Sequence, residues 1–464
     1  MNIGSLINLL ALVRGRGGLS ESETRLRKAA FSSLGQAVSK GANILVTIIS
    51  VPLIIGYLGS AYYGVAMAIS GFANWFLFDT GIAEGVKVRL IETFAREDRR
   101  AAQTYVSTGF FVLLLLFAVI AAGFYASFPF IDWGAVFNVA AGQSHLHAAI
   151  LLTVSMMLIM IPLKIVREIY TADQRGFVFF LWRTAATVLS LGVIWLVIKT
   201  DLGIPGVLAA LLGPIVLVTF VSSLFLFIKD MPWLMPRISY ISMTAWKNMW
   251  VASFGLFMFG IARMAINGAD VFIVNLFKGG DDASVYGLSL RLLLYIEVIV
   301  SFLLYPAWPA IGDAIQKGRK RWVRKASIIM SLLSFGFAVP MCVLLVVFGK
   351  PIIKVWSGGE VDASMPLMLL LGVYLILRIW CDVFGTLLRA LGQVNYLGLA
   401  TFIEAVLHIG IGIILMQRMG LIGFAIGSVG SIALTRCWIL PLECYFSFRR
   451  HSWENIASLD KLDL

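Results

Sequence analysis

Polar residues at helical spacing interrupt the first long apolar stretch of the chain, residues 31–55. Four of them follow one another at steps of four, three and four: Gln36, Lys40, Asn43 and Thr47. This spacing places all four on one face of a helix. Lys40 stands roughly 13 Å along that helix, near the middle of a ~30 Å hydrocarbon core. A lysine facing lipid at that depth costs several kcal/mol, so the face is expected to border a bundle interior or a wet cavity.

A second apolar stretch, residues 249–277, repeats this pattern with Arg263, Asn267 and Asp270 at steps of four and three. A shift of 223 residues, chosen from other positions described below, places Lys40 on Arg263. We therefore expect two equivalent helices to bring one cation each to a similar depth. Two alternatives stay open: Lys40 extends to the headgroups, or Arg263 and Asp270 neutralise each other.

Other charged residues within apolar stretches suggest ion coupling. Glu404 and His408 are four residues apart, and a carboxyl beside an imidazole is a pair that a proton relay uses. A hydrogen-bonded buried pair is the structural alternative. Arg378 and Asp382, also four apart, form a self-satisfied helix pair at least as readily as a functional one. The candidates for ion coupling are Asp79, Asp270, Glu404 and His408.

The composition predicts the elements that position these residues. Of 464 residues, 60% are hydrophobic and only 13% are charged, which indicates an all-α polytopic membrane protein. Residues 1–30 carry an apolar run before their arginines, the reverse of a signal peptide, so an interfacial or cytoplasmic segment is expected there. Twelve spans are predicted near 31–55, 61–83, 104–127, 148–169, 177–198, 204–228, 249–277, 284–311, 326–349, 364–388, 396–416 and 421–446.

Basic residues predict the orientation. With the N-terminus inside, 26 of the 37 Lys and Arg residues fall at inner segments, five fall at outer segments and six fall within spans. This asymmetry places both termini in the cytoplasm. The net charge of +12 then belongs to a membrane-anchoring face, and no nucleic-acid partner is implied.

An internal repeat divides the chain into two halves. Tyr63-Gly64-Val65 and Tyr286-Gly287-Leu288 each open an even-numbered span, 223 residues apart, and the same shift superposes the basic segments 94–102 and 317–325. Gly203-Ile-Pro-Gly206 and Gly420-Leu-Ile-Gly423 match at a spacing of 217. Six spans per copy give both halves the same orientation. We therefore predict two six-helix lobes, 1–235 and 236–464, around a central cleft.

Several kinds of chemistry lack a signal in the sequence. There is no GxxxxGK[ST] motif, no long outer loop and no Ser/His/Asp constellation. The four cysteines lie in apolar runs, and His145 and His147 form an isolated pair, so neither a metal site nor a cofactor is expected. A carrier, not an enzyme, is the function that remains.

Short motifs resemble a known family. Tyr57-Leu58-Gly59, then Tyr63-Gly64, then Asp79-Thr80-Gly81-Ile82 before a basic cytoplasmic helix are similar to the O-antigen flippases. These polysaccharide exporters belong to the multidrug/oligosaccharidyl-lipid/polysaccharide (MOP) exporter superfamily, whose fold is MATE-like. Ser60-Ala61-Tyr62 stand where family members often carry an acidic residue, which suggests a divergent branch.

The resemblance implies a cargo and a setting. The cargo would be an undecaprenyl-diphosphate-linked oligosaccharide, moved by alternating access from the cytoplasmic to the periplasmic leaflet of a bacterial inner membrane. Polysaccharide assembly machinery, membrane lipids and a coupling ion, H⁺ or Na⁺, would be its partners. Charge-assisted bonds would hold the diphosphate. The expected substrate-binding residues are Lys40, Arg263, Arg291, Gln36, Asn43 and Asn267.

Other readings remain beside this one. A cation-coupled multidrug antiporter of the same superfamily would use Asp79, Asp270 and Glu404 as acidic cavity residues. A membrane-embedded glycan ligase or polymerase is the alternative from another class, and a non-transporting scaffold of an assembly complex is a fourth reading.

Overall fold

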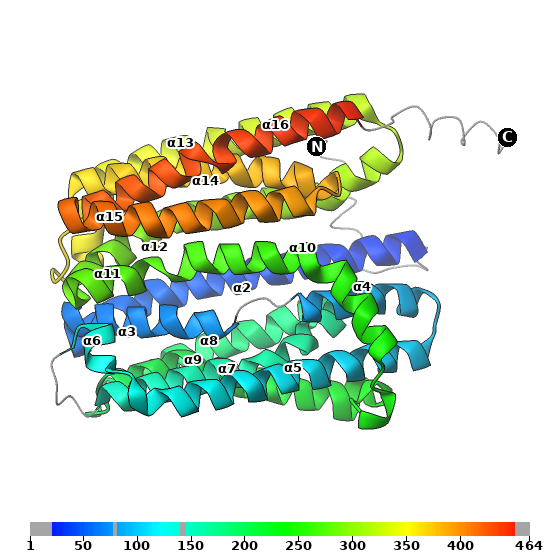
Figure 1. Ribbon diagram of the computed structural model, residues 1–464, viewed down its shortest axis with the longest axis horizontal. Helices are drawn as coiled ribbons and strands as arrows, with labels where there is room; N and C mark the ends of the chain where they lie inside the picture. The colour runs from blue at the N-terminus through cyan, green and yellow to red at the C-terminus, as the bar shows by residue number, and fades with distance from the viewer. Residues whose placement is uncertain (1–20, 78–80, 140–144, 451–464) are drawn as a thin grey trace.

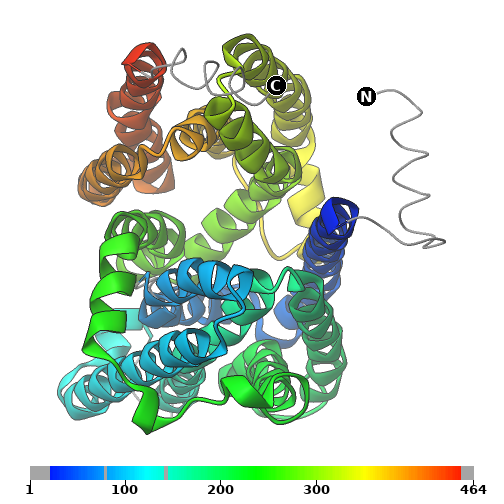
Figure 2. The same cartoon turned by 90° about the vertical axis from the view of Figure 1, so that its right-hand side faces the viewer.

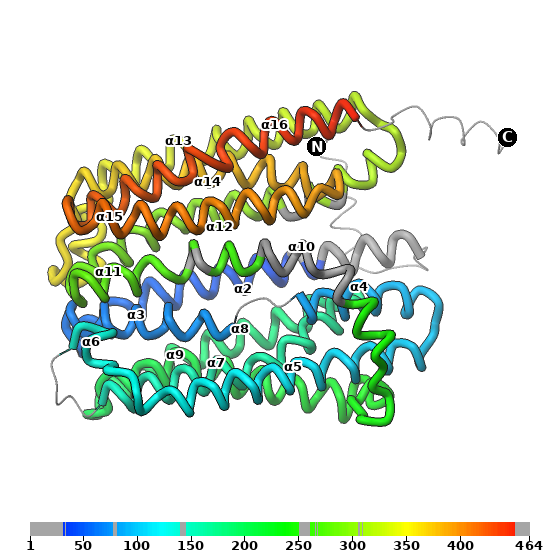
Figure 3. The backbone as a smooth tube through the Cα atoms, in the orientation of Figure 1, coloured from blue at the N-terminus to red at the C-terminus, as the bar shows by residue number. Residues whose placement is uncertain are grey.

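A computed structural model describes residues 21–77, 81–139 and 145–450, and within these ranges the chain is helical with no β-strand. Most helices run along the long axis of the molecule (Figure 1). The tube in Figure 3 shows the same course, from the N-terminal helices on one side to the C-terminal helices on the other. This arrangement is a bundle of membrane-spanning helices, as the apolar runs predict.

The N-terminal half contains eight described α-helices and three short π or 3₁₀ turns. They are α2 (Glu21–Leu58), α3 (Ser60–Asn74), η1 (Trp75–Leu77), α4 (Ile82–Ala95), α5 (Arg99–Ser127), η2 (Phe128–Phe130), α6 (Trp133–Phe137), α7 (His145–Ala172), α8 (Gly176–Val197), α9 (Gly203–Phe225) and η3 (Leu226–Asp230). Helix α2 begins ten residues before the predicted span, because its first turns are polar and carry no hydropathy signal.

The C-terminal half follows two short 3₁₀ turns, η4 (Pro232–Leu234) and η5 (Ile238–Tyr240). Its helices are α10 (Met243–Gly268), α11 (Asp270–Lys278), α12 (Gly280–Gln316), α13 (Lys320–Trp356), α14 (Met365–Ala390), α15 (Val394–Leu434) and α16 (Arg436–Arg450). The predicted span 249–277 is thus broken at Ala269 into α10 and α11.

Nine described helices are long and apolar enough to cross a membrane, and the bent pair α3–α4 makes a tenth. Two further crossings follow from the backbone. The apolar stretch Val394–Arg450 reverses at Gly420, so it crosses twice. Helices α10 and α11 together form the crossing that corresponds to the predicted span 249–277. These elements match the twelve predicted spans, most of them within a few residues at the ends.

The sequence repeat has a counterpart in the backbone. Gly203 and Gly420, which are equivalent in the repeat, both adopt positive φ, at 57° and 64°. Glycine tolerates this region without the steric cost that a Cβ adds. At Gly420 the chain turns back so sharply that a Cβ on Gly427 would lie 2.7 Å from the Cα of Gly412. The repeated glycines thus mark the tight turn between the last two spans of each half.

The molecule has two distinguishable ends. Residues 96–100 and 317–325, which are rich in Lys and Arg, lie at what we call the basic end. The loops before α3, α12 and α14 lie at the opposite end (Figure 1). Helices α3 and α12 pack together, as do α4 and α10, so these pairs join the N-terminal half to the C-terminal half.

Candidate functional site

The polar face of α2 lines cavities between the two halves of the chain. Helix α2 packs mainly on α8, which leaves this face turned toward the C-terminal half. A cavity of about 810 Å³ on the side of the basic end, the basic-end cavity, is bordered by Gln36, Lys40 and Asn43. A second cavity of about 510 Å³, the central cavity, is bordered by Asn43 and Thr47. The two adjoin, because both include Asn43, Arg183, Thr187 and Tyr295.

Lys40 reaches across to the C-terminal half. Its ammonium group donates a hydrogen bond of 2.7 Å to Ser301 Oγ and lies 5.3 Å from the ring centre of Phe302. Both partners belong to α12. The side chain therefore spans the gap between α2 and α12 at the wall of the basic-end cavity, rather than extending along α2 toward the headgroups.

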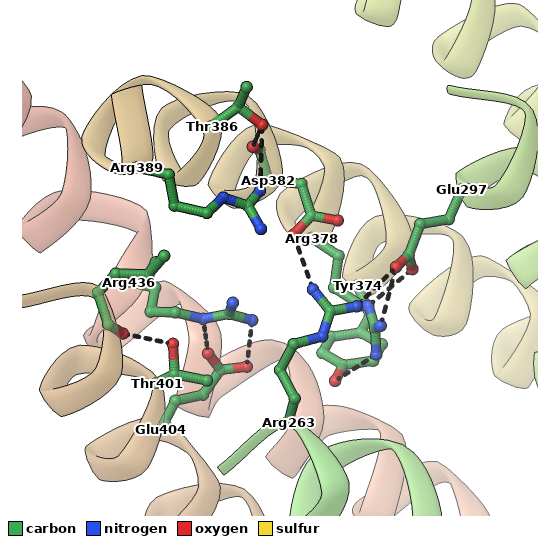
Figure 4. A network of polar contacts seen from close by, with 11 residues as sticks. Arg263, Glu297, Tyr374, Arg378, Asp382, Thr386, Arg389, Thr401, Glu404 and Arg436 are labelled. Atoms are coloured by element: carbon green, nitrogen blue, oxygen red, sulfur yellow. Dashed lines mark hydrogen bonds and ion pairs between the residues drawn. The ribbon is translucent and has the colours of Figure 1, made fainter. Parts of the chain in front are cut away.

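Arg263 lies in a network of charges in the C-terminal half (Figure 4). Its guanidinium donates to Asp382 Oδ1 at 3.3 Å and to Glu297 Oε1 at 3.4 Å. Arg378 also donates to Glu297 Oε1, at 3.1 Å. Arg263 is therefore largely neutralised, although it borders the basic-end cavity with Lys40. Its partners Glu297 and Asp382 lie on α12 and α14, and Arg378 pairs with Glu297 in this network.

Arg291 borders the central cavity, not the basic-end cavity. Its guanidinium lies 3.4 Å from the hydroxyl group of Tyr63, across the contact between α12 and α3. The rest of the polar lining is uncharged except for one further arginine, Arg183 on α8. The uncharged polar residues that line the central cavity are Asn43, Thr47, Ser50, Tyr63, Ser70, Asn74, Thr187, Ser190 and Tyr295.

Arg183 is a site residue that the spacing argument passed over. It is the one charged residue of α8, and Thr187 and Ser190 follow it on the same helix at steps of four and three, so the polar spacing seen in residues 31–55 is present here as well. The structure brings it beside both cavities. None of the described residues that line the central cavity is acidic, and two arginines face it.

A second group of charges on the N-terminal half borders the basic-end cavity. Glu168 is only 1% exposed, and it pairs with Lys87 at 3.3 Å and with Arg167 at 2.5 Å. Glu84 contacts both of these cations. The prediction missed this group, because α4 follows the bend after α3 and was read as a cytoplasmic segment. Among the described lining residues, six cations face this cavity with two carboxylates.

Asp270 and His408 form a pair that is buried among α11, α12, α14 and α15. The His408 Nε2 atom lies 2.7 Å from Asp270 Oδ1, and the side chains are 0% and 2% exposed. The Tyr286 hydroxyl donates to Asp270 Oδ2 at 3.1 Å. Tyr374 stacks on the imidazole with ring centres 5.9 Å apart, while His408 Nδ1 is buried without a hydrogen bond.

Glu404 has a different partner from the one its spacing suggests. It accepts two hydrogen bonds from Arg436, from Nη2 at 3.1 Å and from Nε, and both side chains are buried. The structure therefore pairs Glu404 with Arg436 and His408 with Asp270, not Glu404 with His408. Two other predicted site residues, Asp79 and the side chain of Asn267, lie outside the described residues.

The opposite end of the bundle is closed by direct contact between the halves. Ser60 Oγ donates to Asp281 Oδ1 at 2.5 Å, and Ser284 Oγ donates to the carbonyl oxygen of Ser60. Phe272 on α11 packs edge-on against Trp75 and Phe137 of the N-terminal half. The central cavity therefore lies beneath a tight seal, and it continues toward the basic end through the basic-end cavity.

Known proteins are similar in sequence to this chain. The MatE family model matches residues 256–414. A protein of Salmonella typhi named as an O-antigen transporter is 20% identical over 428 residues, which cover 91% of this chain and 96% of that protein. A Yersinia pseudotuberculosis protein named as an O-antigen export protein is 26% identical over 199 residues, 42% of this chain and 44% of that protein.

Solved structures share the fold. A multidrug resistance MATE family transporter of the MOP superfamily in its inward-facing conformation aligns with a TM-score of 0.69 at 13% identity, covering 90% of this chain and 96% of that one. The outward-facing conformation of such a transporter aligns with a TM-score of 0.65 at 14% identity, covering 95% and 98%. At these identities the likeness concerns the fold alone.

Proposed function

We propose that this membrane protein is a transporter of the MOP exporter superfamily that flips a lipid-linked oligosaccharide, with undecaprenyl diphosphate as the lipid carrier. The observation that carries this proposal is the central cavity. Two arginines face it, none of its described lining residues is acidic, and hydroxyl and amide groups make up the rest of its polar wall. Such a wall suits a ligand that combines an anion with many hydroxyl groups.

The two parts of this wall have different roles in the proposal. Arg183 and Arg291 hold the diphosphate by charge-assisted hydrogen bonds, which are strongest where water is scarce. Asn43, Thr47 and Tyr295 on the facing helices hydrogen-bond to sugar hydroxyls. Lys40 and the cation-rich basic-end cavity attract the diphosphate as it enters, before it reaches the arginines.

The charge of the cavities disfavours the multidrug antiporter alternative. An organic cation needs exposed carboxylates, yet Glu297 and Asp382 face Arg263 and Arg378, and Glu168 faces Lys87 and Arg167. An anionic cargo suits these cavities better, because cations outnumber carboxylates among their described lining residues. The MOP fold serves both kinds of cargo, so this choice rests on the lining residues.

The direction of transport follows from the basic end. We infer from the charge asymmetry that this end and both termini are cytoplasmic, in the inner membrane of a bacterium. The cavities then open toward the cytoplasm, and the seal at Ser60 and Asp281 faces the periplasm. Cargo enters from the inner leaflet, and the seal opens to release it to the outer leaflet while the lipid tail stays in the bilayer.

The test is binding and flipping by purified protein in proteoliposomes. Replacing Arg183 or Arg291 by Gln removes a charged donor worth about 1.5–3 kcal/mol, so affinity for an undecaprenyl-diphosphate oligosaccharide should fall roughly 10- to 100-fold for each. Lys40→Ala should slow entry more than it weakens binding. Arg418→Gln, an exposed arginine at the opposite end, is the matched control.

Two outcomes would overturn the proposal. One is unchanged binding and flipping in R183Q and R291Q with both proteins folded. The other is polymerised or ligated glycan made by the purified wild type, which would point to an enzyme.

We further propose that the Asp270–His408 pair binds a coupling proton. Two tyrosines contact it directly, Tyr286 of α12 on Asp270 and Tyr374 of α14 on His408, and Arg378 of α14 in turn lies 3.5 Å from the Tyr374 hydroxyl. The pair would carry one negative charge without the coupling proton and none with it. Glu297, Asp382 and Glu404 have arginine partners, whereas the described partners of Asp270 are His408 and Tyr286.

The pair lies where such a change can move the two halves. Asp270 begins α11, two residues after Gly268, and a Cβ on Gly268 would lie 3.3 Å from the Trp75 indole nitrogen of the N-terminal half. Asp270→Asn should remove the dependence of flipping on a pH gradient while cargo binding is retained. A gradient dependence in D270N equal to that of the wild type would contradict this assignment.

A further inference from the structure

A groove separate from the cavities between the halves opens at the basic end of the C-terminal half. Its walls are α13 and α16, and α14, which packs against both, forms its floor. Figure 2 looks onto this end, where the red α16 and the yellow-green start of α13 stand apart. The groove has a volume of about 760 Å³.

Helix α14 separates this groove from the transport path. Phe384, Leu387 and Leu391 face the groove at steps of three and four. The opposite face of the same helix presents Asp382, Thr386 and Arg389 to the charge network around Arg263. Because neither Lys40 nor Arg263 reaches the groove, a ligand there does not occupy the cargo path.

The lining has two chemically distinct parts. The depth of the groove is apolar, with Ile311, Val323 and Phe384 among its residues. Its mouth carries four cations and, among the described lining residues, no carboxylate; they are Lys320, Arg321, Arg324 and Arg449.

Aromatic rings hold two of these cations at the mouth. The guanidinium of Arg449 lies 4.6 Å from the ring centre of Tyr445, and the ammonium of Lys320 lies 5.9 Å from that of Phe448. A cation over an aromatic face is partly oriented before a ligand arrives. The cations are therefore presented to an anion at the level where an apolar crevice meets the membrane surface.

We propose that this groove is a binding site for an anionic phospholipid, with the phosphate headgroup among the four cations and an acyl chain along Phe384 and Leu387. The division between a cationic mouth and an apolar depth matches such a lipid and no water-soluble anion. Basic pockets between transmembrane helices are known to hold anionic headgroups in this manner. The bound lipid would hold α13 and α16 together on the outer side of the C-terminal half.

The experiment titrates delipidated, full-length protein in detergent with dioleoyl phosphatidylglycerol or dioleoyl phosphatidylcholine and counts bound lipids by native mass spectrometry. The wild type should retain one phosphatidylglycerol in preference to phosphatidylcholine. R321Q/R324Q/R449Q should bind it roughly 100-fold more weakly, at about 5-fold for each cation. The matched control R96Q/R99Q/R100Q removes three exposed charges from the same end and should bind as the wild type does.

A second variant tests the apolar part without changing charge. Ser327→Trp fills the groove from α13 and should displace the lipid while all four cations remain. Thermal unfolding confirms that each variant is folded.

Four results would overturn the proposal: equal retention of the two phospholipids, equal losses in the two triple variants, displacement of phosphatidylglycerol by equimolar undecaprenyl phosphate, or tighter binding after deletion of residues 451–464. The third would assign the groove to the cargo. The fourth would assign it to the C-terminal segment.

Discussion

The seal at the opposite end predicts a variant that holds the transporter open on that side. A Cβ on Gly64 would lie 1.8 Å from the carbonyl oxygen of Gly280, about 1.5 Å inside the ~3.3 Å of a tight C–H···O contact. In Gly64→Ala the helices α3 and α12 must therefore move apart. The two nearest atoms, O and C of Gly280, belong to the backbone, so a side-chain rotation cannot relieve the overlap.

The overlap in Gly64→Ala exists only in the state that is closed at the seal, and this determines the size of the shift between the closed and open states. Overpacking of this kind costs about 1–3 kcal/mol, and the cost applies only while α3 and α12 are in contact. A state open at the seal is unaffected, so the equilibrium should shift toward it by roughly 5- to 150-fold. The substitution thus changes the ratio of the two states without touching the cavity lining.

The assay is thiol labelling from the outside of the cell. A cysteine at Ser70, which borders the central cavity, is introduced into a chain without the four native cysteines. A membrane-impermeant maleimide should label it faster in Gly64→Ala than in the parent. Gly123→Ala is the matched control, because a Cβ there has no neighbour within 4 Å. Equal rates in both variants, or faster labelling only from the basic end, would refute the reasoning.

Three other substitutions have expected outcomes. Arg436→Gln leaves Glu404 buried without its ion pair, so thermal unfolding in detergent should show a loss of about 3–5 kcal/mol, and the double variant R436Q/E404Q should recover part of it. Gly420→Ala places a side chain at φ 64° and should cost about 1–2 kcal/mol in the same measurement, whereas Gly123→Ala should not. Asn275→Ala removes the 2.7 Å hydrogen bond to the Phe137 carbonyl across the seal, which should also raise outside labelling of the central cavity.

The helices were predictable because hydropathy reports directly on burial in a membrane. Most span ends agree within a few residues, and Gly203 and Gly420, whose motifs helped to define the repeat, both adopt positive φ at turns. The first turns of α2 and the break at Ala269 were missed, since polar helical turns and a one-residue break leave the hydropathy of a window almost unchanged.

Contacts between side chains on different helices could not be predicted from residue spacing. Steps of three and four report only on neighbours along one helix, so Glu404 was set beside His408. Their contacts are Arg436 and Asp270, which lie 32 and 138 residues away. Arg183 was absent from the predicted site although Thr187 and Ser190 follow it at helical spacing, and its place beside both cavities depends on how α8 packs against other helices.

The two arginines of the central cavity have a consequence for the membrane potential. In the proposed cycle the diphosphate diester of the cargo would carry about two negative charges, which Arg183 and Arg291 together would offset, so the loaded cavity would cross the field nearly uncharged. The empty cavity returns with their two positive charges. Each charge that crosses the full field gains about 2.3 kcal/mol per 100 mV, and an inside-negative voltage pulls cations inward. The potential would therefore drive the return of the empty protein, by up to roughly 4.6 kcal/mol per 100 mV, rather than the passage of the cargo.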